Sequence, residues 1–134
     1  MSAETIEAYY RAFNARDYRN MVGLLADGVV HEVNQGPREV GREAFATFLE
    51  RMDAAYSEQI DGLVVMADDS GLRYAAEFTV MGRYLKADPG FPEARGQHYS
   101  LSAGAFFEVR DGVIERVTTY YNLTEWLRQV GAGS

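Results

Sequence analysis

The chain has 134 residues, of which 47% are hydrophobic and 25% charged, and its net charge at pH 7 is −7. These proportions are typical of a globular protein and exclude an intrinsically disordered chain. The negative charge argues against nucleic acid or an anionic membrane surface as a partner, and the absence of cysteine excludes disulfides and thiolate chemistry.

The N-terminal part of the chain predicts two helices followed by a strand. Residues 3–15 carry apolar side chains at helical spacing, namely Ile6, Tyr9, Tyr10 and Phe13. A shorter helix is predicted from Tyr18, with Asp17 as its N-cap and Asp27-Gly28 as its end. The stretch VVHEV (29–33) then alternates as a strand does, and it places His31, one of only two histidines, next to Glu32.

The rest of the chain predicts one long helix, four strands and a last helix. The helix follows Gly41 and has the clearest apolar stripe in the chain. The strands are predicted at 60–67, 72–85, 97–109 and 113–121, and the last helix at 123–130, with a long loop at 86–97. This order predicts a single α+β domain over 1–134, with helices on one face of an antiparallel sheet. Such long strands curl, so we expect the sheet to enclose a cone.

Several stretches resemble a known family. AYYRAFNARDYRNMVGLLADGVV (8–30) is similar to the beginning of ketosteroid isomerases, and HEVNQG, GQHYSLSAGAFFEV and RVTTYYNLTEWLRQV resemble a ketosteroid isomerase-related group. The chain is therefore identified as a member of the nuclear transport factor 2-like superfamily, of the SnoaL-like or ketosteroid isomerase-related type. The resemblance implies a cone-shaped curved sheet packed by N-terminal helices, a short C-terminal helix, and a pocket inside the cone.

The resemblance also predicts which catalytic groups are kept. The oxyanion-hole tyrosine of the isomerases falls on Tyr9, but their aspartate base falls on Val33 and their protonated aspartate falls near Ala105. Both isomerase acids are therefore missing. The Asp-Arg-Asp set of the related limonene epoxide hydrolases is also replaced, by Thr79, Glu77 and Thr119.

Three residues are candidate catalytic groups, and His31 is the first. By the family register it points into the cone, where a neutral imidazole could act as a base near pH 7. The alternative is a core histidine bonded to a backbone carbonyl. Tyr9 would donate a hydrogen bond to a ligand oxyanion, or serve as an aromatic residue at the rim.

Glu77 is the third candidate, and two registers compete for it. Alternation along 72–81 places Glu77 in solvent, opposite the face that carries Tyr74 and Phe78. The family register instead turns Glu77 into the cone and the Tyr74 face toward a dimer partner. We favour the family register because the Tyr74 face would otherwise be a large exposed apolar patch. Glu77 would then orient His31 as a proton-transfer pair.

The pocket is predicted from the family register and from strand alternation. Its lining is expected to comprise Val33, Thr79, Tyr99, Leu101, Ala103, Ala105, Phe107, Thr119 and Tyr121. Small and apolar side chains in this set suit a small apolar oxygenated ligand. We find no metal-ligand spacing, phosphate-binding loop or serine nucleophile motif, so no metal and no cofactor are expected.

These observations lead to one functional hypothesis and one alternative. The chain would be a cofactor-independent isomerase, cyclase or hydrolase that uses acid–base chemistry and forms a homodimer through the outer face of the sheet. The alternative is a non-catalytic ligand-binding or dimeric assembly domain. The sequence shows no apolar stretch long enough to span a membrane and no signal-peptide pattern, so a cytoplasmic location is expected.

Overall fold

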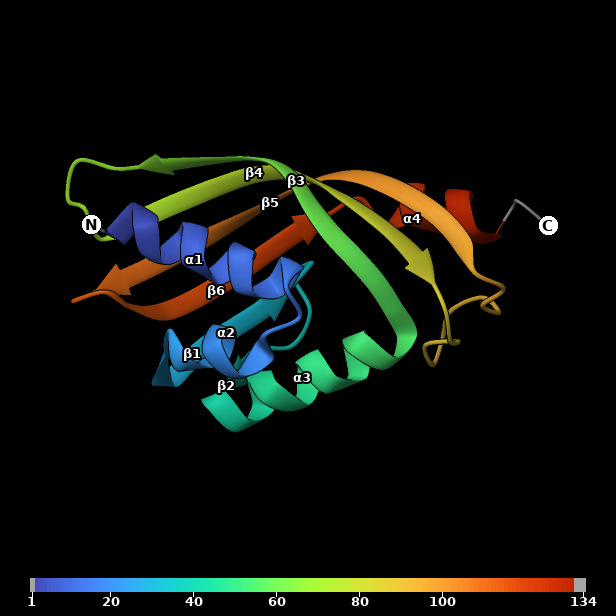
Figure 1. The fold of residues 1–134 in the computed structure, drawn as a ribbon, viewed down its shortest axis with the longest axis horizontal. Helices are drawn as coiled ribbons and strands as arrows, with labels where there is room; N and C mark the ends of the chain where they lie inside the picture. The colour runs from blue at the N-terminus through green and yellow to red at the C-terminus, as the bar shows by residue number, and fades with distance from the viewer. Residues whose placement is uncertain (1, 132–134) are drawn as a thin grey trace.

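The computed structural model describes residues 2–131, which form one curved sheet with helices packed on it (Figure 1). Residue 1 and residues 132–134, at the two ends of the predicted domain range, lie outside the described residues. In chain order, the elements are α1 Ser2–Asn14, α2 Tyr18–Gly23, β1 Leu25–Val33, β2 Glu39–Val40, α3 Arg42–Ala55, β3 Tyr56–Ala67, β4 Arg73–Tyr84, β5 Gln97–Arg110, β6 Val113–Tyr121 and α4 Leu123–Gly131.

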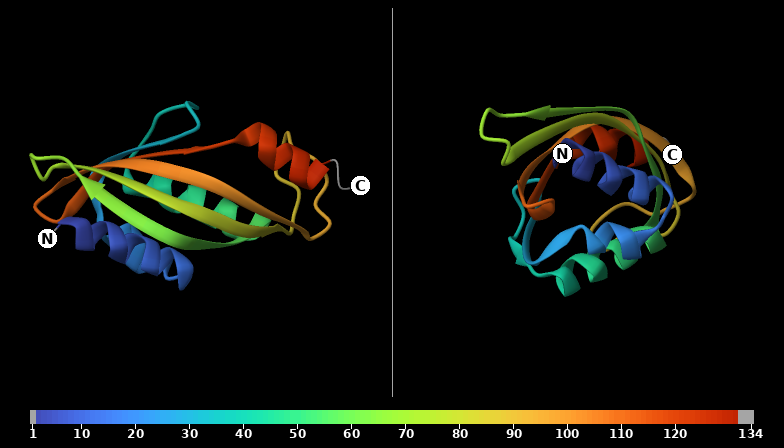
Figure 2. Two further views of the ribbon diagram at one scale, coloured as in Figure 1. Left: turned by 90° about the horizontal axis from the view of Figure 1, so that it is seen from above. Right: turned by 60° about the vertical axis from the view of Figure 1, so that its left-hand side comes forward.

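The strands form a single sheet in the order β2-β1-β6-β5-β4-β3. Strands β3 to β6 are an antiparallel meander, as predicted. Strand β1 instead runs parallel to β6, and the short β2 extends the sheet beyond β1. Because β3, β4 and β5 are 12 to 14 residues long, they twist strongly, and the sheet curves round α1 (Figure 2).

Helices α1, α2 and α3 cover the concave face of the sheet (Figure 1). Ile6, Tyr9 and Tyr10 on α1 are buried, as their helical spacing predicts. Helix α3 adds Phe45 and Leu49 to the same hydrophobic cluster, which also includes side chains from four of the strands. The α+β class, with a curved sheet packed by N-terminal helices and a short C-terminal helix, is therefore confirmed.

Helix α2 and strands β1 and β3 have boundaries that differ from the prediction by several residues. Helix α2 begins at Tyr18 and Asp17 caps it by accepting a hydrogen bond from the backbone N–H of Asn20, as expected. It ends at Gly23, however, and Asp27-Gly28 lies inside β1. Strand β3 starts at residue 56, directly after α3 and four residues earlier than predicted. This early start brings residues 56–59 into the sheet.

Candidate functional site

Cross-strand pairs show which of the predicted pocket residues share the concave face, because paired residues point to the same side of a sheet. Buried Ala105 pairs with Thr119, which in turn pairs with Val33, and Ala103 pairs with Tyr121. The concave face thus carries eight of the nine predicted lining residues, namely Val33, Tyr99, Leu101, Ala103, Ala105, Phe107, Thr119 and Tyr121.

Glu77 and Thr79 lie on the opposite, convex face, so the predicted register of β4 is wrong. Glu77 is exposed, whereas its neighbours Ala76 and Phe78 are buried. The Phe78 ring packs against Tyr10 of α1, with 5.0 Å between ring centroids. The apolar face of β4 is therefore covered by α1 rather than by a dimer partner, and the sheet separates Glu77 from the concave side.

His31 is buried at 4% exposure between two aromatic rings of α3. Its ring centroid lies 4.3 Å from that of Phe45 and 4.6 Å from that of Phe48. Burial lowers the pKa of His31 to about 4, against the opposing effect of the Glu32 charge, so the imidazole is neutral at pH 7. The carboxylate that lies next to it is that of Glu39 on β2, with 3.9 Å between Oε1 and Nδ1.

Tyr9 lies in the same aromatic part of the interior as His31. Its ring packs edge-on against Tyr10, Phe107 and Phe45, with centroid distances of 5.0, 5.6 and 6.4 Å. Burial raises the pKa of the Tyr9 phenol far above its ordinary value. The phenol is therefore neutral at pH 7, the state that a hydrogen-bond donor to an oxyanion requires.

A second polar group, absent from the sequence prediction, occupies another part of the concave face. The hydroxyl of Tyr99 donates a hydrogen bond to Oε2 of Glu58 on β3. Tyr99 is buried, while Glu58 is only partly buried. Burial raises the pKa of Glu58, and the hydrogen bond from Tyr99 acts in the opposite direction. A carboxyl group whose pKa is raised by burial is a stronger base, once ionised, than an ordinary carboxylate.

Three phenols from different elements feel the charge of Glu58, namely those of Tyr18 on α2, Tyr99 on β5 and Tyr121 on β6. Burial is the main cause that raises the pKa of each, and the Glu58 charge adds to it. For Tyr18 the pKa reaches about 12, because its hydroxyl also donates to Asp53 at 2.8 Å. The charge of Glu58 therefore acts on three neutral phenols, of which Tyr99 donates a hydrogen bond to it.

The loop between β4 and β5 is held by a second carboxylate. Asp88 is buried, and its Oδ2 accepts a hydrogen bond of 2.9 Å from the hydroxyl of Tyr56. The hydroxyl of Tyr84 accepts from the backbone N–H of Asp88 at 2.9 Å and donates to the carbonyl of Pro92 at 2.6 Å. Trp126 of α4 packs against four rings at centroid distances of 5.1–6.1 Å, those of Tyr56, Tyr84, Phe91 and Tyr99.

The His31 group and the Glu58 group are two separate clusters. His31 pairs with Val117 of β6, and Val117 pairs with Phe107 of β5. Glu58 is linked by hydrogen bond to Tyr99, eight residues before Phe107 on β5. Eight residues of extended strand span ~27 Å, so no proton passes directly between the two clusters.

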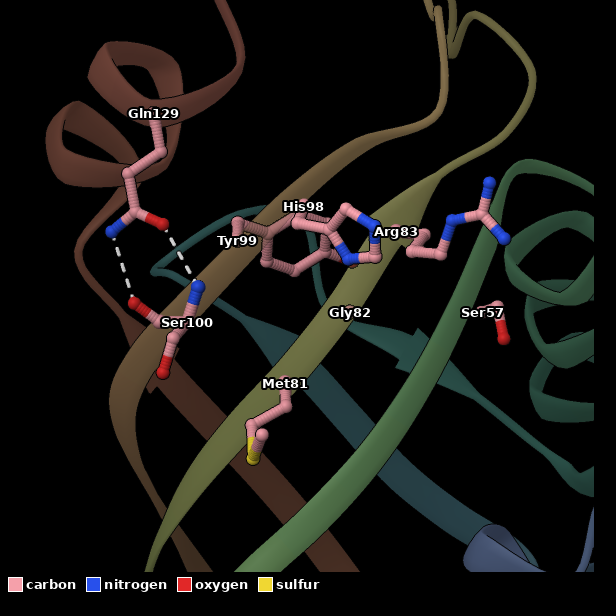
Figure 3. A pocket seen from close by; sticks show the side chains of 8 residues that line it. All are labelled: Ser57, Met81, Gly82, Arg83, His98, Tyr99, Ser100 and Gln129. Atoms are coloured by element: carbon pink, nitrogen blue, oxygen red, sulfur yellow. Dashed lines mark hydrogen bonds between the residues drawn. The ribbon is translucent and has the colours of Figure 1, made fainter.

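Among the hollows on the outer surface of residues 2–131 are two of similar size. One, of about 570 Å³, lies where Met81, Arg83 and His98 project from the convex face of β4 and β5 (Figure 3). At its side, the Gln129 amide of α4 bonds the backbone N and O of Ser100 at 2.8 and 2.9 Å, as a neighbouring strand would. The other, of about 480 Å³, lies between α1 and α2. His31 and Glu58 line neither of these two hollows, whereas Gly82 and Tyr99 line the first. An interior pocket stays a prediction.

Within residues 2–131, no group of three or more acidic or histidine side chains is placed to hold a metal ion. None of the helices in that range is long and apolar enough to cross a membrane.

The sequence matches the family described as the SnoaL-like domain over residues 6–117. The chain belongs to the SnoaL-like domain family. The predicted membership of the nuclear transport factor 2-like superfamily is thereby confirmed. Helix α4, with Trp126, follows the part of this SnoaL-like chain that the family match covers.

Solved structures support the same assignment. The SnoaL-like chain is 53% identical to a protein from Xanthomonas campestris pv. campestris named as a candidate polyketide cyclase, over 97% of this chain and 96% of that one, with a TM-score of 0.93. A protein of the same designation from Pseudomonas putida KT2440 is 49% identical over 98% of both chains, with a TM-score of 0.95. An LEH-like epoxide hydrolase from M. tuberculosis is 21% identical over 98% of this chain and 90% of that one, with a TM-score of 0.78, and shares the fold. No curated protein matches the sequence.

Sequence reasoning missed Glu58 and Asp88 in this SnoaL-like chain for different reasons. Glu58 falls before the predicted strand because the helical stripe of α3 runs up to Tyr56, and the charged side chain interrupts the apolar alternation between Tyr56 and Ile60. Asp88 begins an Asp-Pro-Gly motif that is typical of an exposed turn, and the neighbouring residues do not indicate that its carboxylate is buried. Glu39 was overlooked because β2 has only two residues.

Proposed function

We propose that this SnoaL-like chain is a cofactor-independent acid–base enzyme that moves a proton at a carbon next to a ketone. In this proposal Glu58 is the base, Tyr99 orients its carboxylate, and Tyr121 donates a hydrogen bond to the ketone oxygen. The observation that carries the proposal is the hydrogen bond between a buried phenol and a partly buried carboxyl group whose pKa is raised by burial.

The proposed chemistry needs no co-reactant. A Glu58 oxygen takes the α-proton, the electron pair of the C–H bond forms a C=C bond, and the carbonyl π electrons move to oxygen to give an enolate. The neutral Tyr121 phenol stabilises the oxyanion. Where the substrate has a C=C bond between its β- and γ-carbons, the enolate extends over that bond, and return of the proton to the γ-carbon gives an isomer. Attack of the enolate carbon on a second carbonyl of the same molecule closes a ring, and Glu58 then returns its proton to the new alkoxide.

The charge and composition of the site support a neutral, ketone-bearing substrate. Glu58 and the nearby Asp88 are both acidic, and the charges of both raise the pKa of Tyr121, after burial as the main cause. An anionic ligand would be repelled by the same two groups. The relatives named as candidate polyketide cyclases, at 53% and 49% identity, favour a substrate with more than one carbonyl group.

The proposal is tested by hydrogen–deuterium exchange at a ketone α-carbon. With 2-tetralone as the probe in D2O, proton NMR measures the exchange rate above the buffer background. Glu58→Gln should remove the enzyme-dependent exchange, because the amide cannot take the proton. Glu50→Gln, the same substitution on the exposed side of α3, is the matched control and should leave the rate unchanged. A rate in Glu58→Gln equal to that of the unmodified protein would contradict the assignment.

Ligand binding without chemistry is the second candidate function. It is favoured by the resemblance to the isomerases, which puts Val33 at the position of one of their two catalytic aspartates and Ala105 near that of the other. A thermal-shift screen of ketones and lactones separates the two functions, because a ligand that binds only the folded state raises the unfolding temperature. Stabilisation by 2-tetralone without any enzyme-dependent exchange would support the binding role and reject the catalytic one.

We propose separately that His31 and Tyr9, the residues predicted from the sequence, contact the ligand directly. With a pKa of about 4, His31 is a weak base, and its neutral ring is better suited to donate or accept one hydrogen bond to a ligand. Its packing between Phe45 and Phe48 leaves a structural role equally open to test. His31→Phe should leave the exchange rate unchanged if Glu58 is the base, and should abolish it if His31 is.

We also propose that the protein is a homodimer through its convex face. Five large apolar side chains are exposed there, those of Val64, Met66, Met81, Phe106 and Tyr120. A patch of this kind on a charged protein marks an interface. A second copy is the occupant because the face is complementary to itself: Glu77 and Arg83 lie six residues apart on β4, so a two-fold axis between them would set each opposite the other.

The dimer is tested by light scattering after size-exclusion chromatography. Phe106→Asp should yield a monomer, whereas Val113→Asp, at an exposed apolar residue of the β5–β6 hairpin, should not. Glu77→Arg should weaken the dimer, and the charge exchange Glu77→Arg with Arg83→Glu should restore it. A monomeric mass for the unmodified protein, at a concentration well above that of the exchange assay, would reject the interface.

A further inference from the structure

Strand β4 lies between the two members of the Glu58–Tyr99 pair. Glu58 belongs to β3 and Tyr99 to β5, and the residue of β4 that pairs with both is Gly82. The three residues form one cross-strand row. For the two side chains to meet, the Tyr99 phenol has to pass over the backbone of β4 at this glycine.

The space above Gly82 is filled by the Tyr99 ring. A Cβ atom at position 82 would lie 2.5 Å from Cζ and 2.6 Å from the hydroxyl oxygen of Tyr99, which is far closer than such atoms approach. Gly82 has no positive φ, so the backbone does not call for glycine. The ladder between β4 and β5 is also regular here, without a bulge. The close approach of the ring is therefore the physical reason for a glycine in the middle of this sheet.

We propose that Gly82 is a positioning residue of the site: its missing side chain makes the passage through which the Tyr99 phenol reaches the Glu58 carboxyl group across β4. This inference rests on the proposed function for its catalytic meaning, but not for its structural content. Glycine in a strand interior is destabilising relative to alanine. Gly82 therefore lowers the stability of strand β4 but allows the hydrogen bond between Tyr99 and Glu58.

The passage has a consequence for the protonation of Glu58. Two effects oppose each other there, since burial raises the pKa of Glu58 and the Tyr99 hydrogen bond lowers it. Of the groups that face Glu58, Tyr18 on α2 and Tyr121 on β6 remain when Tyr99 is displaced, and both are neutral phenols. A side chain at position 82 would therefore remove the Tyr99 hydrogen bond, which lowers the pKa of Glu58. Burial, which raises this pKa, would then act without that opposing effect, and the pKa of Glu58 would increase.

The test uses a readout that does not depend on activity. Carbon-13 NMR of the glutamate side chains measures the pKa of Glu58 in the full-length protein, with Glu58→Gln to assign the resonance. Gly82→Ala should raise the pKa of Glu58 to the value found in Tyr99→Phe. In the Tyr99→Ala background, Gly82→Ala should cause no further shift, because the ring that a Cβ atom would displace is already absent.

A matched glycine in another strand controls for loss of backbone freedom. Gly28 of β1 also lacks a positive φ, and a Cβ there would meet no atom within 4 Å. Gly28→Ala should leave the pKa of Glu58 unchanged. Should Gly82→Ala fail to fold, Gly82→Ala with Tyr99→Ala, which removes the clashing ring, is expected to restore folding.

The outcomes separate this inference from the proposed reaction. An unchanged pKa of Glu58 in folded Gly82→Ala would overturn the inference, whatever the exchange rate. So would a further shift of the same size in the Tyr99→Ala background, where no ring is left to displace. If the pKa of Glu58 rises as expected but the unmodified protein does not catalyse α-proton exchange, the inference about Gly82 is supported and the proposed reaction is rejected. If both hold, the exchange rate of Gly82→Ala matches that of Tyr99→Phe.

Discussion

His31 should make the folded protein sensitive to mild acid. Its pKa falls from the ordinary 6.5 to about 4 on folding, because burial between two phenylalanine rings disfavours the charged imidazolium. Each pKa unit corresponds to ~1.4 kcal/mol, so full protonation of this ring costs the folded state about 3 kcal/mol. That is a large part of the ~5–15 kcal/mol by which small domains are stable.

The sign follows from which state binds the proton. Between pH 6.5 and 4 the unfolded chain carries more protons on this histidine than the folded chain does, so the free energy of unfolding decreases as the pH falls through that window. Above pH 6.5 the contribution of the neutral ring is fully present. At pH 5.5 the linkage relation gives a loss of ~1.4 kcal/mol relative to pH 7.5. This pH also stays above the sequence pI of about 4.8, near which solubility falls.

Urea denaturation followed by circular dichroism measures the effect. The free energy of unfolding is measured for the protein and for its His31→Phe variant, at pH 7.5 and at pH 5.5. At each pH the value for the protein is subtracted from that for the variant. The effect of the carboxyl groups, which both proteins share, cancels in this difference. The difference should change by ~1.4 kcal/mol in favour of the variant at the lower pH. A difference that is the same at both pH values, or an imidazole that titrates near 6.5 by NMR, would refute the argument from burial.

Three further predictions concern stability and local opening. Glu58→Gln should gain stability relative to the unmodified protein as the pH rises from 5 to 8 in thermal unfolding, because a carboxyl group whose pKa is raised on folding loses stability when it ionises. Phe107→Ala, which empties a fully buried site against Tyr9, should cost about 3–5 kcal/mol in urea unfolding. Tyr84→Phe leaves the Asp88 N–H and the Pro92 carbonyl without their phenol partner, so it should lower the free energy of unfolding by about 1–3 kcal/mol. It should also speed amide hydrogen exchange within residues 86–92. Unchanged exchange in this segment would show that the phenol does not hold the loop.

The fold was predictable because most elements carry their own local signal. The spacing of Ile6, Tyr9 and Tyr10 predicts the buried face of α1, and strict alternation gives the strands of the meander to within a few residues. The parallel pairing of β1 with β6 could not be obtained in this way, because it joins segments some 90 residues apart and no local pattern encodes it.

The site was harder to predict because it depends on register. For Glu77 the alternation of β4 gave the correct face, and it was overruled by the argument that the Tyr74 face would be exposed. That argument failed because it did not count α1, whose Tyr10 covers Phe78. The Glu58–Tyr99 contact was out of reach for a different reason. It joins residues 41 positions apart across an intervening strand, and it depends on the absence of a side chain at Gly82.

The aromatic cluster around α4 gives the protein an intrinsic optical probe. Trp126 is the sole tryptophan of the chain, and its indole touches the rings of Tyr56, Tyr84 and Tyr99. Light absorbed by tryptophan but not by tyrosine therefore excites one fluorophore, located beside the phenol that bonds Glu58. Any ligand or loop movement that changes the polarity there should alter its emission wavelength, without a label and without a second tryptophan to dilute the signal.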